Sequence, residues 1–476
     1  MLDFENLEKY RENNRIEAKR ALGGLPHSIW ETYSAFANTL GGILLLGVEE
    51  HEDKSLHPVN LPDPEKLVRE FWDIINNPNK VSVNILASED VAIRQIDGKN
   101  IIVITVPRAQ RNDRPVYVEG NSMTGTYRRN GEGDYRCTKE EVFAMTRDAS
   151  VKTQDMQILE EMDTDVFCLE SVHSYRMRMK YARPGHVWED LNDSDFLFRL
   201  GAVGRGADGR FHPTAAGLLM FGYEYEITRE YPMYFLDYQE KMEDNVRWTD
   251  RIVSSSGDWS GNVYDFYFRV YNRLSQDIKV PFRIEDGRRI DDTPVHTALR
   301  EALANCLVNA DYYGRQGLVI IKKHDRITFS NPGAFRIEID VAKSGGISDP
   351  RNSALLKMFN LIDIGERAGS GIPNIYYVWK NQGWKEPIII EGFEPERITL
   401  DLSIGKIGDK KSAIKDPIKM QIVEFLTDHT VGKTSEIAEY IGLKPSRTRD
   451  YLKELISENT VTAEGANRNR IYRLKA

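Results

Sequence analysis

Carboxylates and a lysine gather near the start of the chain in a pattern that could do chemistry. Glu12 and Glu17 are five residues apart, Lys19 follows, and the acids Glu49 and Glu50 come later. Mg²⁺ and Mn²⁺ prefer oxygen ligands, and a lysine beside them can hold a phosphate. These residue types therefore predict either metal-dependent phosphodiester cleavage or nucleic-acid binding without cleavage. The alternative is a set of solvated surface acids, since charged side chains usually face water.

The elements around these acids follow from hydrophobic periodicity. Alternation over 16–19 predicts a strand, helical spacing over 29–37 predicts a helix, and the apolar run 43–48 predicts a buried strand with acids at its end. Further strands are predicted at 81–86 and 100–106. The order predicts an α/β domain that brings the acids together.

A second pair of reactive side chains, Glu301 and Asn305, is four residues apart on the strongly amphipathic helix predicted at 296–314. At a nucleotide, a carboxylate can orient an attacking water and an amide oxygen can ligate Mg²⁺. Such a pair is also common on ordinary helices. Strands predicted at 318–322 and 326–330 follow it.

Basic and aromatic residues mark two candidate nucleic-acid surfaces. Tyr127, Arg128 and Arg129 lie on a glycine-rich predicted hairpin, where rings can stack on bases and guanidinium groups can pair with phosphates. The alternative is an ordinary basic turn. After it, Thr138 and Glu141 have the spacing of a capping box and predict a helix to about residue 155.

The end of the chain has the pattern of a winged helix. After a lysine-rich linker at 405–415, three short helices and two strands are predicted. The basic side chains expected to meet DNA lie on the third helix and on the wing: Arg447, Arg449, Lys453, Arg468 and Arg470. A winged helix that contacts protein is the alternative.

The length, composition and charge of the chain restrict these interpretations. A chain of 476 residues predicts two to four domains, and 41% hydrophobic residues suffice for packed cores. The net charge is −9, yet residues 405–476 hold 14 Lys and Arg against 10 Asp and Glu, which gives +4 there and −13 elsewhere. Any nucleic-acid contact must therefore be local. Three cysteines without metal-site spacing, no leader and no long apolar run predict a cytoplasmic protein without membrane contact.

The segments "ENNRIEAK" and "SAFANTLGGILLLGVEE" resemble the Schlafen AlbA-like domain. In RNA-cleaving members, two Glu and one Asp form a metal-dependent nuclease centre, and the resemblance places these on Glu12, Glu17 and Glu50. Ala18 replaces the usual Phe, and Glu50 replaces the Asp. Many bacterial members are DNA-binding regulators, so the resemblance implies the domain more directly than the reaction.

The region from the helix at 296 onward resembles the GHKL ATPase fold, in the divergent group labelled RecG carboxy-terminal. The resemblance implies that Glu301 is the general base and Asn305 the Mg²⁺ ligand, with Gly369 and Gly371 in a lid over phosphate. Asn331 and Gly333 stand where true GHKL enzymes carry an adenine-reading Asp-x-Gly-x-Gly motif. The alternative is a nucleotide-binding fold that has lost nucleotide binding and serves oligomerisation.

Together these observations predict an α/β multidomain protein with four parts. The predicted parts are an AlbA-like domain at 1–150, a middle scaffold at 151–290, a GHKL-like α/β sandwich at 291–404 and a winged helix at 415–476. We expect a homo-oligomeric DNA- or RNA-binding protein that binds ATP with Mg²⁺, in transcriptional control or phage defence. The rivals are a Schlafen-like endoribonuclease with Mg²⁺ or Mn²⁺ at its acids, and a non-catalytic scaffold.

Overall fold

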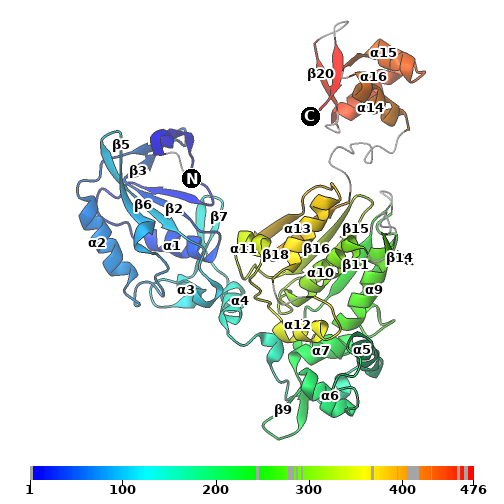
Figure 1. Ribbon diagram of the computed structural model, residues 1–476. Helices are drawn as coiled ribbons and strands as arrows, with labels where there is room; N and C mark the ends of the chain where they lie inside the picture. The colour runs from blue at the N-terminus through cyan, green and yellow to red at the C-terminus, as the bar shows by residue number, and fades with distance from the viewer. Residues whose placement is uncertain are drawn as a thin grey trace. The chain divides into compact units, whose positions relative to one another are not determined.

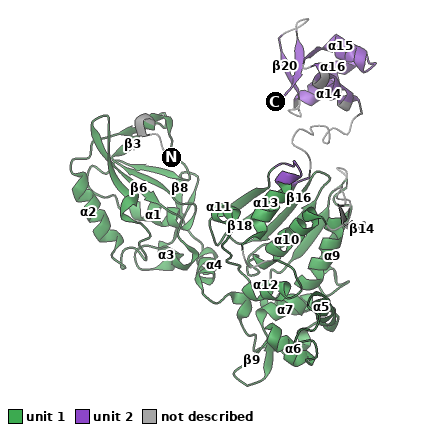
Figure 2. Ribbon diagram, viewed as in Figure 1, with its two compact units in different colours: residues 1–379, 386–402 green, residues 380–385, 403–476 purple. Residues whose placement is uncertain are grey.

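The structure is a computed structural model with a mixed α/β architecture in two compact units (Figure 2). The first unit comprises residues 1–379 and 386–402, and the second comprises 380–385 and 403–476. The residues described are 4–242, 246–276, 283–285, 288–290, 293–365, 369–393, 395–404, 417–429, 431–457, 461–465 and 470–475. The predicted linker at 405–415 lies outside them.

A four-stranded mixed sheet forms the amino-terminal part of the first unit (Figure 1). Its strands, in order, are β1 (Ile16–Lys19), β2 (Gly42–Leu46), β6 (Lys99–Val106) and β5 (Val91–Ile96). Helices α1 (Ile29–Asn38) and α2 (Pro64–Ile75) pack on one face, where Phe36, Phe71 and Ile104 share a core. Leu45 and Val103 belong to a second core on the other face. Burial on both faces explains why β2 is almost wholly apolar.

The sheet differs from the sequence prediction in one strand. Residues 81–86 are extended but form only an isolated bridge, between Val81 and Val118, so the predicted strand there is wrong. Their backbone groups bond to loops and side chains instead: Ser82 N donates to Tyr117 O, and Ile85 N donates to the Tyr33 hydroxyl. The missing edge strand is β5, which pairs with β6 across the turn at Asp97-Gly98.

A hairpin and a capped helix complete this part. Strands β7 (Tyr127–Asn130) and β8 (Gly133–Arg136) pair antiparallel. Helix α4 (Lys139–Ala149) begins at the predicted capping box, because Thr138 N donates to Glu141 and Glu141 N donates to the Thr138 hydroxyl at 3.3 Å. The helix ends before the predicted residue 155.

Helices then lead into the second sheet. They are α5 (Leu169–Ala182), α6 (Asp193–Leu200), α7 (Ala215–Phe221), α8 (Glu224–Glu230) and α9 (Val263–Ser275), with the small hairpin β9 (Val203–Arg205) and β10 (Phe211–Pro213) between α6 and α7. All seven residues of α7 are buried. This apolar helix therefore lies inside the unit.

A six-stranded sheet forms the rest of the first unit. Its order is β12 (Asp250–Val253), β11 (Leu236–Glu240), β15 (Leu318–Lys322), β16 (Arg326–Pro332), β18 (Glu396–Ser403) and β17 (Ile388–Phe393). Helices α10 (Pro294–Val308) and α9 lie side by side along it, and α13 (Gly371–Asn381) follows α12 (Ser353–Asn360) (Figure 1). Helix α10 starts at Thr293 with Pro294 in its first turn, and Leu299, Leu303 and Leu307 are fully buried.

The second unit contains α14 (Pro417–His429), α15 (Thr434–Tyr440) and α16 (Pro445–Ser457), with a three-stranded antiparallel sheet. The sheet order is β19 (Gly432–Lys433), β21 (Ile471–Leu474) and β20 (Val461–Glu464). Its core joins Ile422, Leu452 and Tyr472. In the part of the chain that is described, no helix is long and apolar enough to cross a membrane.

Candidate functional site

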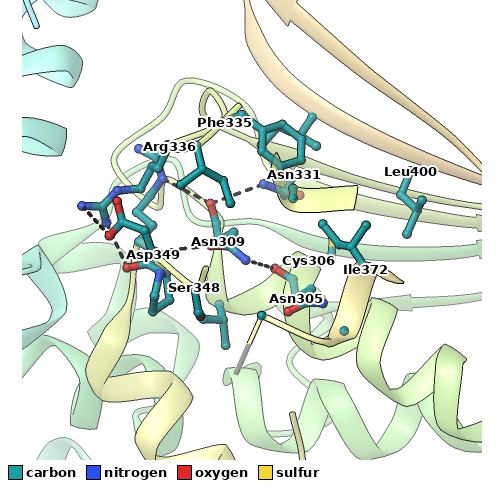
Figure 3. Close-up of a pocket in the computed structure, with 18 of the residues that line it drawn as sticks. Asn305, Cys306, Asn309, Asn331, Phe335, Arg336, Ser348, Asp349, Ile372 and Leu400 are labelled. Atoms are coloured by element: carbon teal, nitrogen blue, oxygen red, sulfur yellow. Dashed lines mark hydrogen bonds and ion pairs between the residues drawn. The ribbon is translucent and has the colours of Figure 1, made fainter. Parts of the chain in front are cut away.

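A cavity in the carboxy-terminal half of the first unit is lined by Asn305 and Asn331 (Figure 3). Glu301 also lines it. Helix α10, strands β16 and β18, the segment after β16 and the start of α13 supply its walls. The predicted residues that line it are Glu301, Asn305, Asn331, Gly369 and Gly371. Its volume of about 140 Å³ is roughly ten times what one water molecule needs. Residues predicted separately from one helix, one strand end and one glycine-rich segment thus meet at one place.

The Glu301–Asn305 pair has the predicted helical geometry. Asn305 Nδ2 donates a hydrogen bond of 3.3 Å to Glu301 Oε1. This leaves Asn305 Oδ1 as the atom that can ligate a cation. Gly371 packs directly against the Glu301 carboxylate, and a Cβ at that position would overlap Oε1. Only glycine therefore lets the start of α13 approach the acid this closely.

Asn331 lines the cavity, whereas Gly333 supports its wall from outside the lining. Asn331 is 5% exposed, and its Nδ2 lies 3.4 Å from Asn309 O and 3.3 Å from Pro332 O. Gly333 has φ +102° and does not line the cavity. A Cβ there would lie 2.9 Å from the Arg351 guanidinium, so the glycine makes room for that side chain.

Sequence reasoning missed five polar residues of the cavity wall: Asn309, Arg336, Ser348, Asp349 and Arg351. Arg351 Nη1 pairs with Asp148 at 2.6 Å, and its Nη2 donates to Ala334 O at 2.7 Å. Arg336 lies 3.5 Å from Asp349. Asn309 could have been found, because it is two turns beyond Glu301 on the same helix face.

The wall is tied to the amino-terminal part by ion pairs that we call the seam. The seam consists of Arg108–Glu391, Arg111–Asp349, Arg147–Asp311 and Asp148–Arg351. Arg108 is held to Glu391 by two hydrogen bonds of 2.6 and 2.8 Å, and the two side chains are 5% and 2% exposed. Fork-shaped pairs of this kind combine charge with fixed geometry. The seam therefore fixes the position of one side of the cavity.

Two further ionisable groups at the seam have shifted pKa values. Burial, with the nearby Arg108 charge, lowers the pKa of Arg114 to about 10. Burial raises the pKa of Glu396 to about 7, although the Arg351 charge opposes this. Burial is the main cause of both shifts.

The amino-terminal acids do not form the predicted metal cluster. Glu12 Oε1 accepts a 2.9 Å hydrogen bond from Ala18 N, and its pKa is raised by burial and by the nearby Glu17 and Glu50 charges. Glu17 is 6% exposed and turns its oxygens to Lys19 at 2.5 Å and Arg129 at 2.7 Å.

Within the described ranges, no three His, Cys, Asp or Glu side chains are placed to share a metal ion. Glu50 instead lies 3.5 Å from Lys54. Lys19, Arg129 and Lys54 are thus the counter-ions of Glu17 and Glu50 within the fold.

The side chains of the β7–β8 hairpin also form contacts within the protein. Tyr127 is buried, and its hydroxyl donates to Glu31 at 3.0 Å. Arg128 pairs with Glu141 at 3.2 Å. The Arg129 side chain is 1% exposed and holds Glu17 and Asp134. Two groups predicted to act on nucleic acid, Glu17 and Arg129, thus meet each other, and a nucleic-acid role for the hairpin stays a prediction.

The third helix of the second unit presents its basic side chains to solvent. Arg447, Arg449 and Lys453 are exposed on α16, while Thr448 and Leu452 on the same helix are fully buried. Arg470 is exposed beside Tyr472, and Arg468 lies outside the described residues. Arg447 and Arg449 are therefore accessible to a partner, while Lys453 lies 3.9 Å from Asp450 on the same helix.

Comparison with known families gives four matches along the chain. Residues 12–138 match the family "Schlafen, AlbA_2", and residues 318–400 match "Putative ATP-dependent DNA helicase recG C-terminal". Residues 143–237 match a domain of unknown function, and 418–468 match "FaeA-like protein". No curated protein matches the chain. Helix α10, with Glu301, lies just before the RecG-type match.

Two of the matching solved structures differ in how much of the chain they cover. The N-terminal domain of a RecG-related protein from Nitrosomonas europaea is 33% identical, with 29% of this chain and 95% of that chain covered and a TM-score of 0.23. The DIP2311 protein from Corynebacterium diphtheriae is 16% identical, with 97% and 91% covered and a TM-score of 0.41.

Proposed function

We propose that this chain, which carries a Schlafen AlbA_2 domain and a RecG-type carboxy-terminal domain, binds ATP beside Glu301 and a nucleic acid through its second unit. Its role would be transcriptional control or defence against phage. The two families point to a nucleic-acid-binding, ATPase-like protein. The observation that carries the ATP proposal is that Glu301, Asn305, Asn331 and the two lid glycines line one cavity.

The cavity residues fit a magnesium nucleotide. Asn305 Oδ1 would ligate Mg²⁺, and the ion would neutralise phosphate charge. Glu301 would accept a proton from an attacking water. Asn331 would hydrogen-bond the base, and the backbone amides of 369–371 would approach the phosphates. Apolar residues of β17, β18 and α13 supply the surface for a base: Ile389, Ile398, Leu400 and Ile372.

Gly371→Ala tests this site. The added Cβ must displace Glu301 Oε1, so we expect ATP affinity to fall at least about tenfold, or roughly 1.4 kcal/mol. Isothermal titration of the full chain with ATP and Mg²⁺ measures it. Gly392→Ala is the matched control, because its Cβ meets nothing closer than 3.7 Å. Unaltered affinity in Gly371→Ala, or no ATP binding by the wild type, contradicts the proposal.

A winged helix on the second unit is the second part of the proposal. The succession of α14, β19, α15, α16 and a β-hairpin supports it, with α16 as the helix that enters the major groove. The +4 charge of residues 405–476 and the exposed Arg447 and Arg449 support contact with phosphates.

Replacing both Arg447 and Arg449 with Ala should weaken duplex binding and flatten its dependence on salt. Each lost phosphate contact removes about 0.9 from the slope of log affinity against log salt, so a decrease of about 2 is expected. Fluorescence anisotropy at several salt concentrations measures both values. Arg473→Ala is the control, because Glu464 already pairs with that side chain. Equal slopes in the double variant and wild type would assign α16 another purpose.

A metal-dependent nuclease at the amino-terminal acids stays a prediction: Glu17 is paired with two cations, and no three such side chains among the described residues are placed to share a metal ion. A homo-oligomer stays a prediction.

A further inference from the structure

A second, larger hollow shares no lining residue with the Glu301 cavity. Helices α5 and α9, Arg300 in the middle of α10 and residues 362–364 form it, with a volume of about 650 Å³. That volume is within the range of sites for small molecules. Its distinctive lining residues are four aromatic rings and two arginines: Tyr181, Tyr267, Phe268, Tyr271, Arg178 and Arg300. None of these residues has a part in the ATP proposal.

One side chain of this groove has an unused polar group. Tyr267 is fully buried, and its hydroxyl has no hydrogen-bond partner among the described residues. A buried hydroxyl without a partner costs about 1–3 kcal/mol. Because Tyr267 lines the groove, a ligand with a polar atom can supply the missing bond.

The groove also contains two guanidinium groups, from Arg178 and Arg300. The Arg178 guanidinium lies 3.6 Å from the centroid of the Phe268 ring, and no described carboxylate forms an ion pair with it. Arg300 Nη1 donates to the Tyr271 hydroxyl at 2.9 Å, which orients the guanidinium at the groove. The one acid of the lining, Asp363, is paired with Arg183 at 3.2 Å. An anion is therefore favoured here over a cation.

Exposed rings provide the other half of the recognition. The Tyr181 side chain is 90% exposed at the rim. A large aromatic side chain left in water is suited to stacking on a planar ring, and stacked bases gain about 1–3 kcal/mol each. A ligand that joins a planar ring to an anion would use Tyr181, Arg178 and Arg300 together.

We propose that this groove binds a nucleotide, with its base stacked at Tyr181 and its phosphate on Arg178 and Arg300. The Tyr267 hydroxyl would bond to a polar atom of the same ligand. The ligand chemistry is shared by a free mononucleotide and by one residue of a single strand. The site is separate from the Glu301 cavity and does not depend on ATP binding there.

Titration of the full chain with UMP and with a short single-stranded oligouridylate tests the proposal. We expect binding that Arg178→Ala weakens about tenfold, because both the phosphate contact and its orientation by Phe268 are lost. Lys180→Ala is the matched control, since this exposed cation on the same helix is paired with Glu189. Tyr267→Phe should weaken binding several-fold while the thermal midpoint of the free protein stays the same or rises.

The two ligands and the variants distinguish the possible outcomes of this experiment. Comparable binding of UMP and the oligonucleotide identifies a free nucleotide as the ligand, whereas binding of the oligonucleotide alone identifies a strand. Gly371→Ala should leave these affinities unchanged, so failure of the ATP proposal does not affect this one. Absence of binding by both ligands, or equal affinity of Arg178→Ala and wild type, overturns the proposal.

Discussion

Glu301→Gln is expected to reduce ATP hydrolysis by at least about a hundredfold while ATP still binds within a few-fold of the wild-type affinity. General bases contribute about 10²–10⁴-fold to a rate, and the amide of Gln cannot take a proton from water. Gln has nearly the same volume as Glu, and its side-chain oxygen can still accept the bond from Asn305 Nδ2. Phosphate release under saturating ATP gives the rate, and equilibrium titration gives the affinity.

Glu386→Gln is the control for this experiment, because Glu386 is exposed and does not line the cavity. Equal hydrolysis in Glu301→Gln and wild type would remove Glu301 from the role of base. Loss of ATP binding together with hydrolysis would instead assign Glu301 a structural role against Gly371.

Arg108→Ala should destabilise the first unit by about 3–5 kcal/mol, the range for breaking a buried ion pair by removing one partner. Glu391 is 2% exposed and would be left charged without its counter-ion. Its remaining hydrogen bond is from Phe335 N at 2.7 Å. Urea denaturation followed by tryptophan fluorescence measures the loss as a lower midpoint at a similar slope.

A second substitution separates charge from packing in this result. In Arg108→Met with Glu391→Gln, no charge remains buried and the Phe335 N–H keeps an acceptor, so much of the stability should return. If the double variant is as unstable as Arg108→Ala, packing of the arginine stem rather than the ion pair accounts for the loss. If Arg108→Ala unfolds like the wild type, the seam does not contribute to stability.

The regular elements could be predicted wherever local signals agree. The capping box at Thr138, the apolar strand β2, and α10 with its proline start were all predicted, because periodicity and capping chemistry act over a few residues. Strand β5 was missed, although the turn signal Asp97-Gly98 stands between it and β6. The predicted strand at 81–86 failed because its hydrogen-bond partners are loops, which periodicity does not reveal.

The candidate site also combines contacts that the sequence predicts with contacts that it does not predict. Glu301 and Asn305 could be paired from their spacing on one helix. The Arg351–Asp148 and Arg108–Glu391 contacts join residues 203 and 283 positions apart, and no local pattern predicts such partners. The clearest case is Glu17 with Arg129: the sequence predicted two active groups, but folding makes each the counter-ion of the other.

The seam also limits how this protein can be recombined with its relatives. A chimera that joins a foreign amino-terminal domain to this carboxy-terminal half would keep Glu391, Asp349 and Asp311 but would need arginines at the matching places. Without them, Glu391 and Asp311 would lose these counter-ions, while Asp349 would keep Arg336 as its partner. Functional exchange of these domains therefore requires that the arginines and their acids be transferred as a set.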